Sequence, residues 1–214
     1  MRSATVILFA RAPVPGRVKT RLAAAIGAEA AAEAHSCFVE DMLDKLESLR
    51  PRAELELHTD TGTDAWSRPG VARFLQAEGD LGHRMLEALR RGLEAECERV
   101  MIVGSDAPTL PVWRLETLLD SPADVALGPA EDGGYYAIAC RRIHPAMFDG
   151  VAWSGPRALE QTCTAARACG LSLDVGPSWY DIDTPEDLER LAAAPDLPHH
   201  TALWLRRRGK VSLL

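Results

Sequence analysis

The fold of this chain is decided by the stretch Val100-Met-Ile-Val-Gly-Ser-Asp-Ala-Pro108. Its first four residues form a continuous apolar run, which is typical of a central parallel strand covered on both faces. A glycine, a serine and an aspartate follow at the point where such a strand would end. Because ligands of open parallel sheets bind beyond the carboxyl ends of the strands, the stretch predicts an α/β fold with Asp106 at its site.

Short apolar runs alternate with amphipathic segments along the rest of the chain, which is the pattern of an α/β domain. The 214 residues suit one domain of ordinary size, and no internal repeat, low-complexity tract or linker divides them. We therefore expect residues 1–214 to form a single mixed domain. Further strands are expected over residues 5–9, 53–58, near 74–75, 125–127, 136–139 and 171–175. Helices are expected over residues 28–49, from 80 onward, 112–119, 155–169 and 184–194.

The composition bounds the function classes. Hydrophobic residues make up 47% of the chain and charged residues 26%, as in a soluble globular protein. The net charge of −7 argues against a general nucleic-acid binder. No apolar stretch approaches the roughly 20 residues that cross a bilayer, so no membrane span is expected. The five cysteines form no Cys-x-x-Cys pair and are expected to be reduced, as in a cytoplasmic protein.

A basic loop directly follows the first expected strand. It reads Arg11-Ala-Pro-Val-Pro-Gly-Arg-Val-Lys-Thr-Arg21 and holds four cations and no acid. Cations beside a helix N-terminus would clamp a phosphate or diphosphate. Two prolines and a glycine make the loop stiff, which favours this interpretation over a merely solvated basic loop. Positive charge is thus concentrated at one place in an acidic chain, which points to a small anionic ligand.

Carboxylates follow other expected strands. Asp106 is placed to hold a hard divalent cation such as Mg²⁺ or Mn²⁺, or else to cap the next helix or turn. Asp181 and Asp183 precede a well-capped helix, and their spacing does not decide which one is the metal ligand. Asp132 precedes two glycines and could orient or accept a proton, unless it only builds a hairpin turn.

Three weaker signals remain. Residues 76–85 contain Asp80, a good N-cap, and Arg84, a first-turn cation that opposes the helix dipole unless a ligand or carboxylate pairs with it. Trp153 and the serine after it either join the site or pack in the core. The basic tail over residues 203–214 is expected to be a solvated or interface segment, and the oligomeric state stays open, with a homodimer among the options. None of the six histidines has the spacing of a metal site.

Taken together, these segments resemble a bacterial family of glycosyltransferases that was formerly a domain of unknown function. The first and last segments are also similar to the molybdenum-cofactor and phospholactate guanylyltransferases. The resemblance implies the nucleotide-diphospho-sugar transferase (GT-A) fold, a Rossmann-like three-layer α/β/α arrangement with a mostly parallel central sheet. The matching segments are residues 7–16, 79–82, 104–108, 128–129, 132–136, 153–154 and 181–188.

The resemblance also implies a site for a nucleotide or sugar nucleotide and a small-molecule acceptor. Asp106 and Asp183 match metal-binding acids that would hold Mg²⁺ or Mn²⁺, although Gly104 stands where the usual Asp-x-Asp motif has its first acid. The expected catalytic residues are Asp132, Lys19 and Arg21. The expected nucleotide- and phosphate-binding residues are Ala10, Arg11, Pro13, Gly16, Lys19, Arg21, Asp80, Gly82, Arg84 and Ser105. The expected acceptor-binding residues are Gly133, Gly134, Trp153 and Ser154.

Three functions are compatible with such a site. The first hypothesis is a divalent-metal-dependent glycosyltransferase with a nucleotide-activated sugar donor, in which the carboxylates hold a cation on the diphosphate. The second is a nucleotidyltransferase that joins a nucleoside triphosphate to a phosphorylated acceptor and releases pyrophosphate. The third is a nucleotide-binding module without catalysis. The released product separates the first two, and the absence of any product would favour the third.

Overall fold

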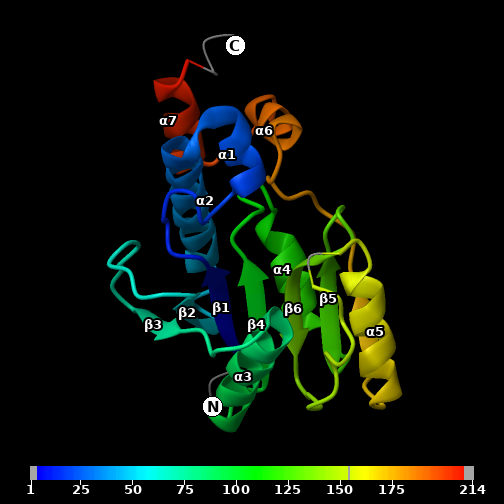
Figure 1. Cartoon of the computed structure of the whole chain (residues 1–214). Helices are drawn as coiled ribbons and strands as arrows, with labels where there is room; N and C mark the ends of the chain where they lie inside the picture. The colour runs from blue at the N-terminus through cyan, green and yellow to red at the C-terminus, as the bar shows by residue number, and fades with distance from the viewer. Residues whose placement is uncertain (1–3, 154, 210–214) are drawn as a thin grey trace.

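A mostly parallel sheet forms the centre of the molecule (Figure 1). The computed structural model describes residues 4–153 and 155–209. In these residues the strands are β1 (Ala4–Ala10), β2 (Ala53–Thr59), β3 (Val71–Leu75), β4 (Arg99–Gly104), β5 (Val125–Pro129), β6 (Tyr135–Cys140) and β7 (Leu173–Val175). Their order across the sheet is β3-β2-β1-β4-β6-β5-β7, and β6 alone runs against its two neighbours within the described part of the chain. The predicted mostly parallel α/β sheet is therefore confirmed.

Helices cover both faces of this sheet (Figure 1). The described helices are α1 (Thr20–Ile26), α2 (Ala28–Glu47), α3 (Leu81–Glu94), α4 (Val112–Asp120), α5 (Ala158–Ala168), α6 (Pro185–Ala192) and α7 (His199–Arg207). Side chains of α2 and α4 pack on one face, and those of α3 and α5 pack on the other. This is the three-layer arrangement expected from the resemblance.

The alternation of side chains along β1 and β4 explains the two packed faces. Val6 and Leu8 of β1 face α2 and α4, whereas Ile7 and Phe9 face α3 and α5. Every residue of β1 is buried, and so are the first five of β4, because these strands lie inside the sheet with helices on both sides. The burial of these strands on both faces therefore explains the unbroken apolar runs in the sequence.

The strand register positions the site. Phe9 of β1 pairs with Gly104 of β4, so the residues that follow the two strands leave the sheet side by side. Figure 1 shows α1 and α6 beyond these carboxyl ends. A third apolar cluster, with buried side chains from α1, α2, α6 and α7, packs these helices together.

The C-terminal tail differs from the sequence prediction. Residues 203–207 belong to helix α7 and are not a solvated segment, because Thr201, Trp204 and Leu205 share a buried face of that helix. The prolines at 195 and 198 and the run of arginines concealed this short apolar stripe. The exposed arginines at its end lie on the outer side of the same helix.

Two further expectations concern the sequence as a whole. No helix in the described ranges is both long and apolar enough to cross a membrane. The five cysteines are all free, as predicted.

Candidate active site

The basic loop is folded back on itself between β1 and α1. The Arg11 guanidinium donates to the Arg17 carbonyl oxygen, and the backbone N–H of Ala12 donates to Asp60 Oδ1 at 2.7 Å. Asp60 follows β2, whose last residue pairs with Ala10, so the sheet register brings this carboxylate to the loop. Lys19 ends the loop in the left-handed backbone region, with φ of 47°, which turns its side chain inward at the start of α1.

Lys19 is the centre of the site. Its Nζ lies 2.7 Å from Asp106 Oδ1 and 2.7 Å from Asp183 Oδ1. The Lys19 side chain is only 3% exposed, whereas the carboxylates are 45% and 38% exposed. Three residues from three distant segments, all predicted from the sequence, therefore meet at the carboxyl edge of the sheet.

The charges of this cluster stabilise one another. Burial alone would lower the pKa of the Lys19 ammonium, but the attraction of Asp106 and Asp183 outweighs it and raises this pKa above its ordinary value. Removal from water opposes ionisation of Asp106, yet the Lys19 charge, with His35 next in size, lowers the pKa of the Asp106 carboxyl. One monovalent cation thus sits between two carboxylates, and the pair keeps an unbalanced negative charge.

Backbone contacts hold the two carboxylates together. The backbone N–H of Ile182 donates to the carbonyl oxygen of Asp106 at 2.9 Å, which fixes the late acidic segment against the end of β4. Helix α6 is capped by Thr184 and Asp187 in a reciprocal capping box. The Asp183 side chain therefore does not cap this helix, and it contacts Lys19 instead.

His35 is a site residue that sequence reasoning missed. It lies on α2, is 3% exposed, and its Nε2 is 2.9 Å from the Arg11 carbonyl oxygen. Its Nδ1 is buried without a hydrogen-bond partner and lies 4.0 Å from Asp106 Oδ1. Burial lowers the pKa of the imidazole. The helix pattern of the sequence shows His35 only as one more position on a buried face, so no local signal could have singled it out.

These donors fit a divalent cation. Carboxylate oxygens and an imidazole nitrogen are common metal ligands, and Lys19 already shows that the two carboxylates accept positive charge between them. The buried Nδ1 of His35 adds a lone pair that no described protein group satisfies. The residues present therefore suit the metal that the resemblance implies.

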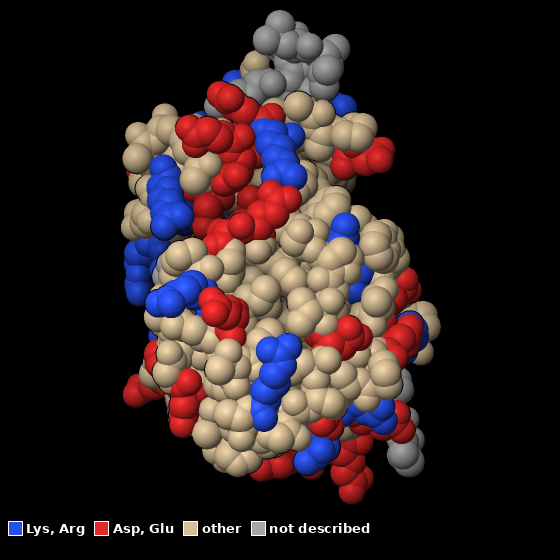
Figure 2. Space-filling view, turned by 90° about the vertical axis from the view of Figure 1, so that its right-hand side faces the viewer, with Lys and Arg blue, Asp and Glu red and all other residues tan. Residues whose placement is uncertain are grey.

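A second pair of acids borders the site. Burial, then repulsion by Asp132 and Asp183, raises the pKa of Asp181 to about 6. Asp132 accepts a hydrogen bond from the backbone N–H of Gly134 at 2.8 Å, so its carboxylate also supports its own turn. Gly133 has φ of +91°, and a Cβ there would lie 1.9 Å from the Pro156 carbonyl oxygen, so only glycine fits. Figure 2 shows acidic side chains gathered in the upper part of one face, at the height of α1 and α6 in Figure 1.

The loop before α3 contributes polar groups from residues 76–85. Asp80 accepts a hydrogen bond from the His83 N–H and caps α3, as predicted. The Arg84 side chain donates to the Gly79 carbonyl oxygen, so a backbone carbonyl and not a carboxylate pairs with this first-turn cation. Gln76 donates to the Ala10 carbonyl oxygen and ties this loop to the end of β1.

Other predicted residues have mainly structural contacts. Trp153 packs edge-on against Phe148 and Tyr135, and a Cβ at Gly82 would meet its ring at 2.7 Å. Ser105 is buried beside Asp106. Arg21 is exposed, as are Arg11 and Gly16, while Pro13 is half-buried. Ser154 lies outside the described residues.

A second acid–histidine cluster lies on α2 and α7. Asp41, Asp44 and His200 offer ligand atoms within 4.8 Å of one another, so this cluster could bind a metal ion. The buried Asp41 carboxylate already accepts hydrogen bonds from the backbone N–H groups of His200 and Thr201, each at 2.8 Å, and from the Thr201 hydroxyl. Asp41 therefore caps the first turn of α7.

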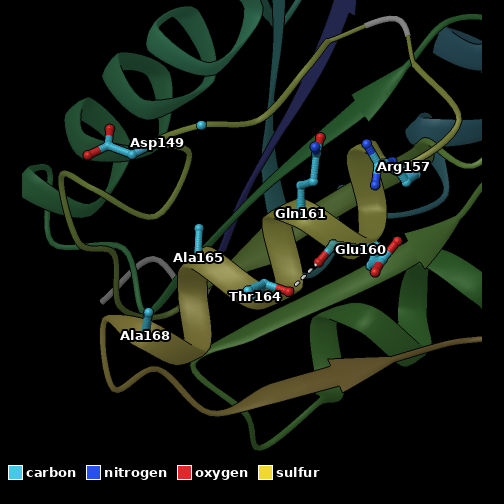
Figure 3. A pocket seen from close by; sticks show the side chains of 8 residues that line it. Asp149, Arg157, Glu160, Gln161, Thr164, Ala165 and Ala168 are labelled. Atoms are coloured by element: carbon cyan, nitrogen blue, oxygen red, sulfur yellow. Dashed lines mark hydrogen bonds between the residues drawn. The ribbon is translucent and has the colours of Figure 1, made fainter.

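A hollow of about 360 Å³ lies along α5 and contains none of these residues. Figure 3 shows Arg157, Gln161 and Ala165 among its lining, with the Thr164 hydroxyl donating to the Glu160 carbonyl oxygen. The candidate active site is thus the strand-end cluster around Lys19 and not this hollow.

Comparisons with known proteins agree with this fold. A solved structure of a proposed nucleotide-diphospho-sugar transferase from Desulfovibrio desulfuricans G20 matches 99% of this chain and 97% of its own, with a TM-score of 0.88 and 31% identity. A cytidylyltransferase from Leptospira borgpetersenii shares the fold at a TM-score of 0.57 and 13% identity, with 99% and 97% of the two chains covered. The chain is a transferase with the nucleotide-diphospho-sugar transferase fold.

The family is also clear. The profile described as "Uncharacterized protein conserved in bacteria (DUF2064)" matches residues 44–155, and the chain belongs to this family. The 2-phospho-L-lactate guanylyltransferase of Methanosarcina mazei is 30% identical over 151 residues, which are 67% of this chain and 69% of that relative. The resemblance drawn from the sequence is therefore confirmed, and the guanylyltransferase relatives support the second hypothesis, nucleotidyl transfer, better than the first, glycosyl transfer.

Proposed function

We propose that this protein is a metal-dependent nucleotidyltransferase. It would transfer a nucleoside monophosphate from a nucleoside triphosphate to a phosphorylated small molecule and release pyrophosphate. The observation that carries the proposal is the Lys19 ammonium held 2.7 Å from both Asp106 and Asp183 at the end of the basic loop. A cation that can bind phosphate oxygens and two carboxylates that can hold a metal meet at this point. A triphosphate site needs both kinds of group.

The residues divide the work as follows. Asp106 and Asp183 would hold Mg²⁺ or Mn²⁺, which would supply positive charge to neutralise the phosphate oxygens. Lys19 then exchanges its carboxylate partners for the phosphate oxygens of the nucleotide. An oxygen of the acceptor phosphate attacks the α-phosphorus, and the bond from that phosphorus to the bridging oxygen of the β-phosphate breaks. Lys19 and the loop arginines at 11 and 21 stabilise the charge on the departing pyrophosphate.

The acceptor is expected on the side of Asp132 and Asp181. A carboxylate there can accept a hydrogen bond from an acceptor hydroxyl and orient it. Gly133 keeps the turn close to the start of α5, since its carbonyl oxygen accepts a hydrogen bond from the Leu159 N–H. Trp153 would limit the size of the acceptor from the opposite loop.

The relative from Methanosarcina mazei supports guanosine triphosphate and a phosphorylated hydroxy acid as the first substrates to test. The free cysteines suit the cytoplasm, where nucleoside triphosphates are abundant. Glycosyl transfer stays the second candidate, because the solved relative from Desulfovibrio desulfuricans G20 is described as a nucleotide-diphospho-sugar transferase.

Product analysis tests the proposal. The protein is incubated with each nucleoside triphosphate, Mg²⁺ or Mn²⁺ and a panel of phosphorylated hydroxy acids, with sugar nucleotides in parallel. We expect pyrophosphate release and a product in which a phosphoanhydride bond joins the nucleoside monophosphate to the acceptor phosphate. Release of nucleoside diphosphate from a sugar nucleotide would instead establish glycosyl transfer, and metal-dependent binding without any product would favour a non-catalytic module.

A further inference from the structure

The tautomer of His35 follows from its contacts. Its Nε2 lies 2.9 Å from the Arg11 carbonyl oxygen, and a carbonyl oxygen can only accept. Nε2 therefore carries the proton and donates to Arg11. In the neutral ring the other nitrogen, Nδ1, is then left with a lone pair that accepts and cannot donate.

This lone pair faces the site and is unsatisfied. Nδ1 is fully buried, has no hydrogen-bond partner among the described residues, and lies 4.0 Å from the carboxylate oxygen Oδ1 of Asp106. A buried lone pair on Nδ1 thus faces the oxygen of a half-exposed carboxylate. A buried acceptor without a partner costs about 1–3 kcal/mol. Asp106 Oδ1 already contacts the Lys19 ammonium, whereas Nδ1 is satisfied only when a proton donor or a cation reaches it.

The separation of the two atoms suits a metal ion. A divalent cation of this kind binds carboxylate oxygen or imidazole nitrogen at roughly 2.0–2.2 Å, so two ligands on opposite sides of it lie at most about 4.0–4.4 Å apart. The observed 4.0 Å between His35 Nδ1 and Asp106 Oδ1 is inside that limit. The Lys19 ammonium contacts the same Asp106 oxygen, so positive charge is already stable there.

We propose that His35 is a nitrogen ligand of the catalytic cation, beside Asp106 and Asp183. The inference rests on the proposed function only in assuming that the carboxylates hold a metal. Its chemical consequence is selectivity. An imidazole ligand favours Fe²⁺, Ni²⁺, Cu²⁺ and Zn²⁺, whereas a site of oxygen atoms alone suits Mg²⁺ and Mn²⁺.

A spectroscopic experiment tests this directly. Protein with ¹⁵N-labelled histidine is loaded with Mn²⁺ and guanosine triphosphate, and nitrogen coupling to the Mn²⁺ electron spin is measured by pulsed electron paramagnetic resonance. We expect a coupling that changes from the ¹⁴N to the ¹⁵N pattern with the label, which excludes the nitrogens of the guanine base. The His35→Gln variant should lose this coupling and bind Mn²⁺ roughly tenfold more weakly or worse.

The glutamine variant is chosen for its shape. Its side-chain amide can still donate to the Arg11 carbonyl oxygen, so it removes Nδ1 and keeps the loop contact. His200→Gln is the matched control, because His200 also lies beside a carboxylate, Asp44, at 3.2 Å. The coupling should persist in this control. If His35→Gln fails to fold, the labelled wild-type protein and the control still decide the question.

The outcomes separate the two proposals. Bound Mn²⁺ without histidine coupling, or a coupling that disappears in His200→Gln alone, would overturn the ligand role of His35 and leave the proposed function standing. A wild-type protein that binds no Mn²⁺ with nucleotide would overturn the ligand role as well. Pyrophosphate release is measured on the same preparation, so its absence reports separately on the proposed function.

Discussion

Two clusters of this protein each contain two aspartates and a histidine, yet they differ in what their atoms already contact. In the cluster of Asp41, Asp44 and His200, ligand atoms are closely gathered but engaged. Asp41 accepts three hydrogen bonds from the first turn of α7, and Asp44 pairs with Arg68 and His200. In the Lys19 cluster, one ammonium serves two carboxylates, and a histidine nitrogen has no partner.

The difference teaches that proximity of ligands is a weaker sign of a metal site than unsatisfied ligands. A carboxylate that caps a helix loses that stabilisation when it turns to a metal. When Asp106 and Asp183 bind a metal, they give up only their shared contact with Lys19. The lysine can then bind phosphate oxygens instead. We therefore propose that catalysis takes place at the Lys19 cluster and that Asp41 has a structural role, and four variants test this proposal.

The largest effect is expected for Asp106→Asn. The variant loses a charge that holds the cation, so nucleotidyl transfer should fall by about 10³-fold, which corresponds to about 4 kcal/mol of transition-state stabilisation. Its stability should fall only moderately, because the buried Lys19 ammonium keeps Asp183 as a carboxylate partner. Turnover is measured by pyrophosphate release; activity close to that of the wild type would remove Asp106 from the site.

Lys19→Met should have the next largest effect. It should lower the rate of nucleotidyl transfer and raise the affinity for Mn²⁺. Transfer should fall by about 10²-fold, since the departing pyrophosphate loses a cation. Binding of Mn²⁺ to the nucleotide-free protein should tighten, because the carboxylates lose their internal competitor. Calorimetric titration checks the second point. Arg17→Met, an exposed cation of the same loop, is the control and should leave Mn²⁺ binding unchanged.

Asp41→Ala should reverse this pattern. The substitution removes three hydrogen bonds to a buried carboxylate, so the free energy of unfolding should fall by about 2–3 kcal/mol. The turnover of the folded protein should stay near that of the wild type. Chemical denaturation and pyrophosphate release are compared on one sample. Loss of activity without loss of stability would indicate that the metal binds at Asp41 and not in the Lys19 cluster.

The smallest effect is expected for Asp181→Asn, and it depends on pH. Asp181 has a pKa of about 6 in the folded protein, above its ordinary value, so ionisation is harder there than in the unfolded chain. Ionised Asp181 therefore destabilises the folded state. This destabilisation is complete above pH about 6 and absent below pH about 4. The variant should be more stable by about 1–2 kcal/mol at pH 7, allowing for partial exposure. Melting curves of the variant and the wild type are compared at both pH values. The two proteins should differ in stability at pH 7 and have nearly equal stability at pH 4.

Much of the fold could be predicted because burial on two faces leaves unbroken apolar runs, as in β4. Strand order and the join between Lys19 and Asp183 could only be inferred through the resemblance, since 164 residues separate the two. Helix α7 was missed because its apolar stripe is short and ends in arginines. His35 was missed for a different reason: its meaning depends on an unpaired nitrogen, and pairing is a property of three-dimensional contacts.

The single lysine between two carboxylates has a consequence for the order of binding. Without ligands the cluster of Lys19, Asp106 and Asp183 is net negative, so it repels a bare triphosphate and binds a bare metal ion only against the lysine. Each ligand removes the obstacle to the other, because the metal reverses the sign of the cluster and the triphosphate draws the lysine away. By thermodynamic reciprocity the nucleotide strengthens metal binding by the same factor as the metal strengthens nucleotide binding. We therefore expect the site to bind the metal–nucleotide complex more tightly than either component alone.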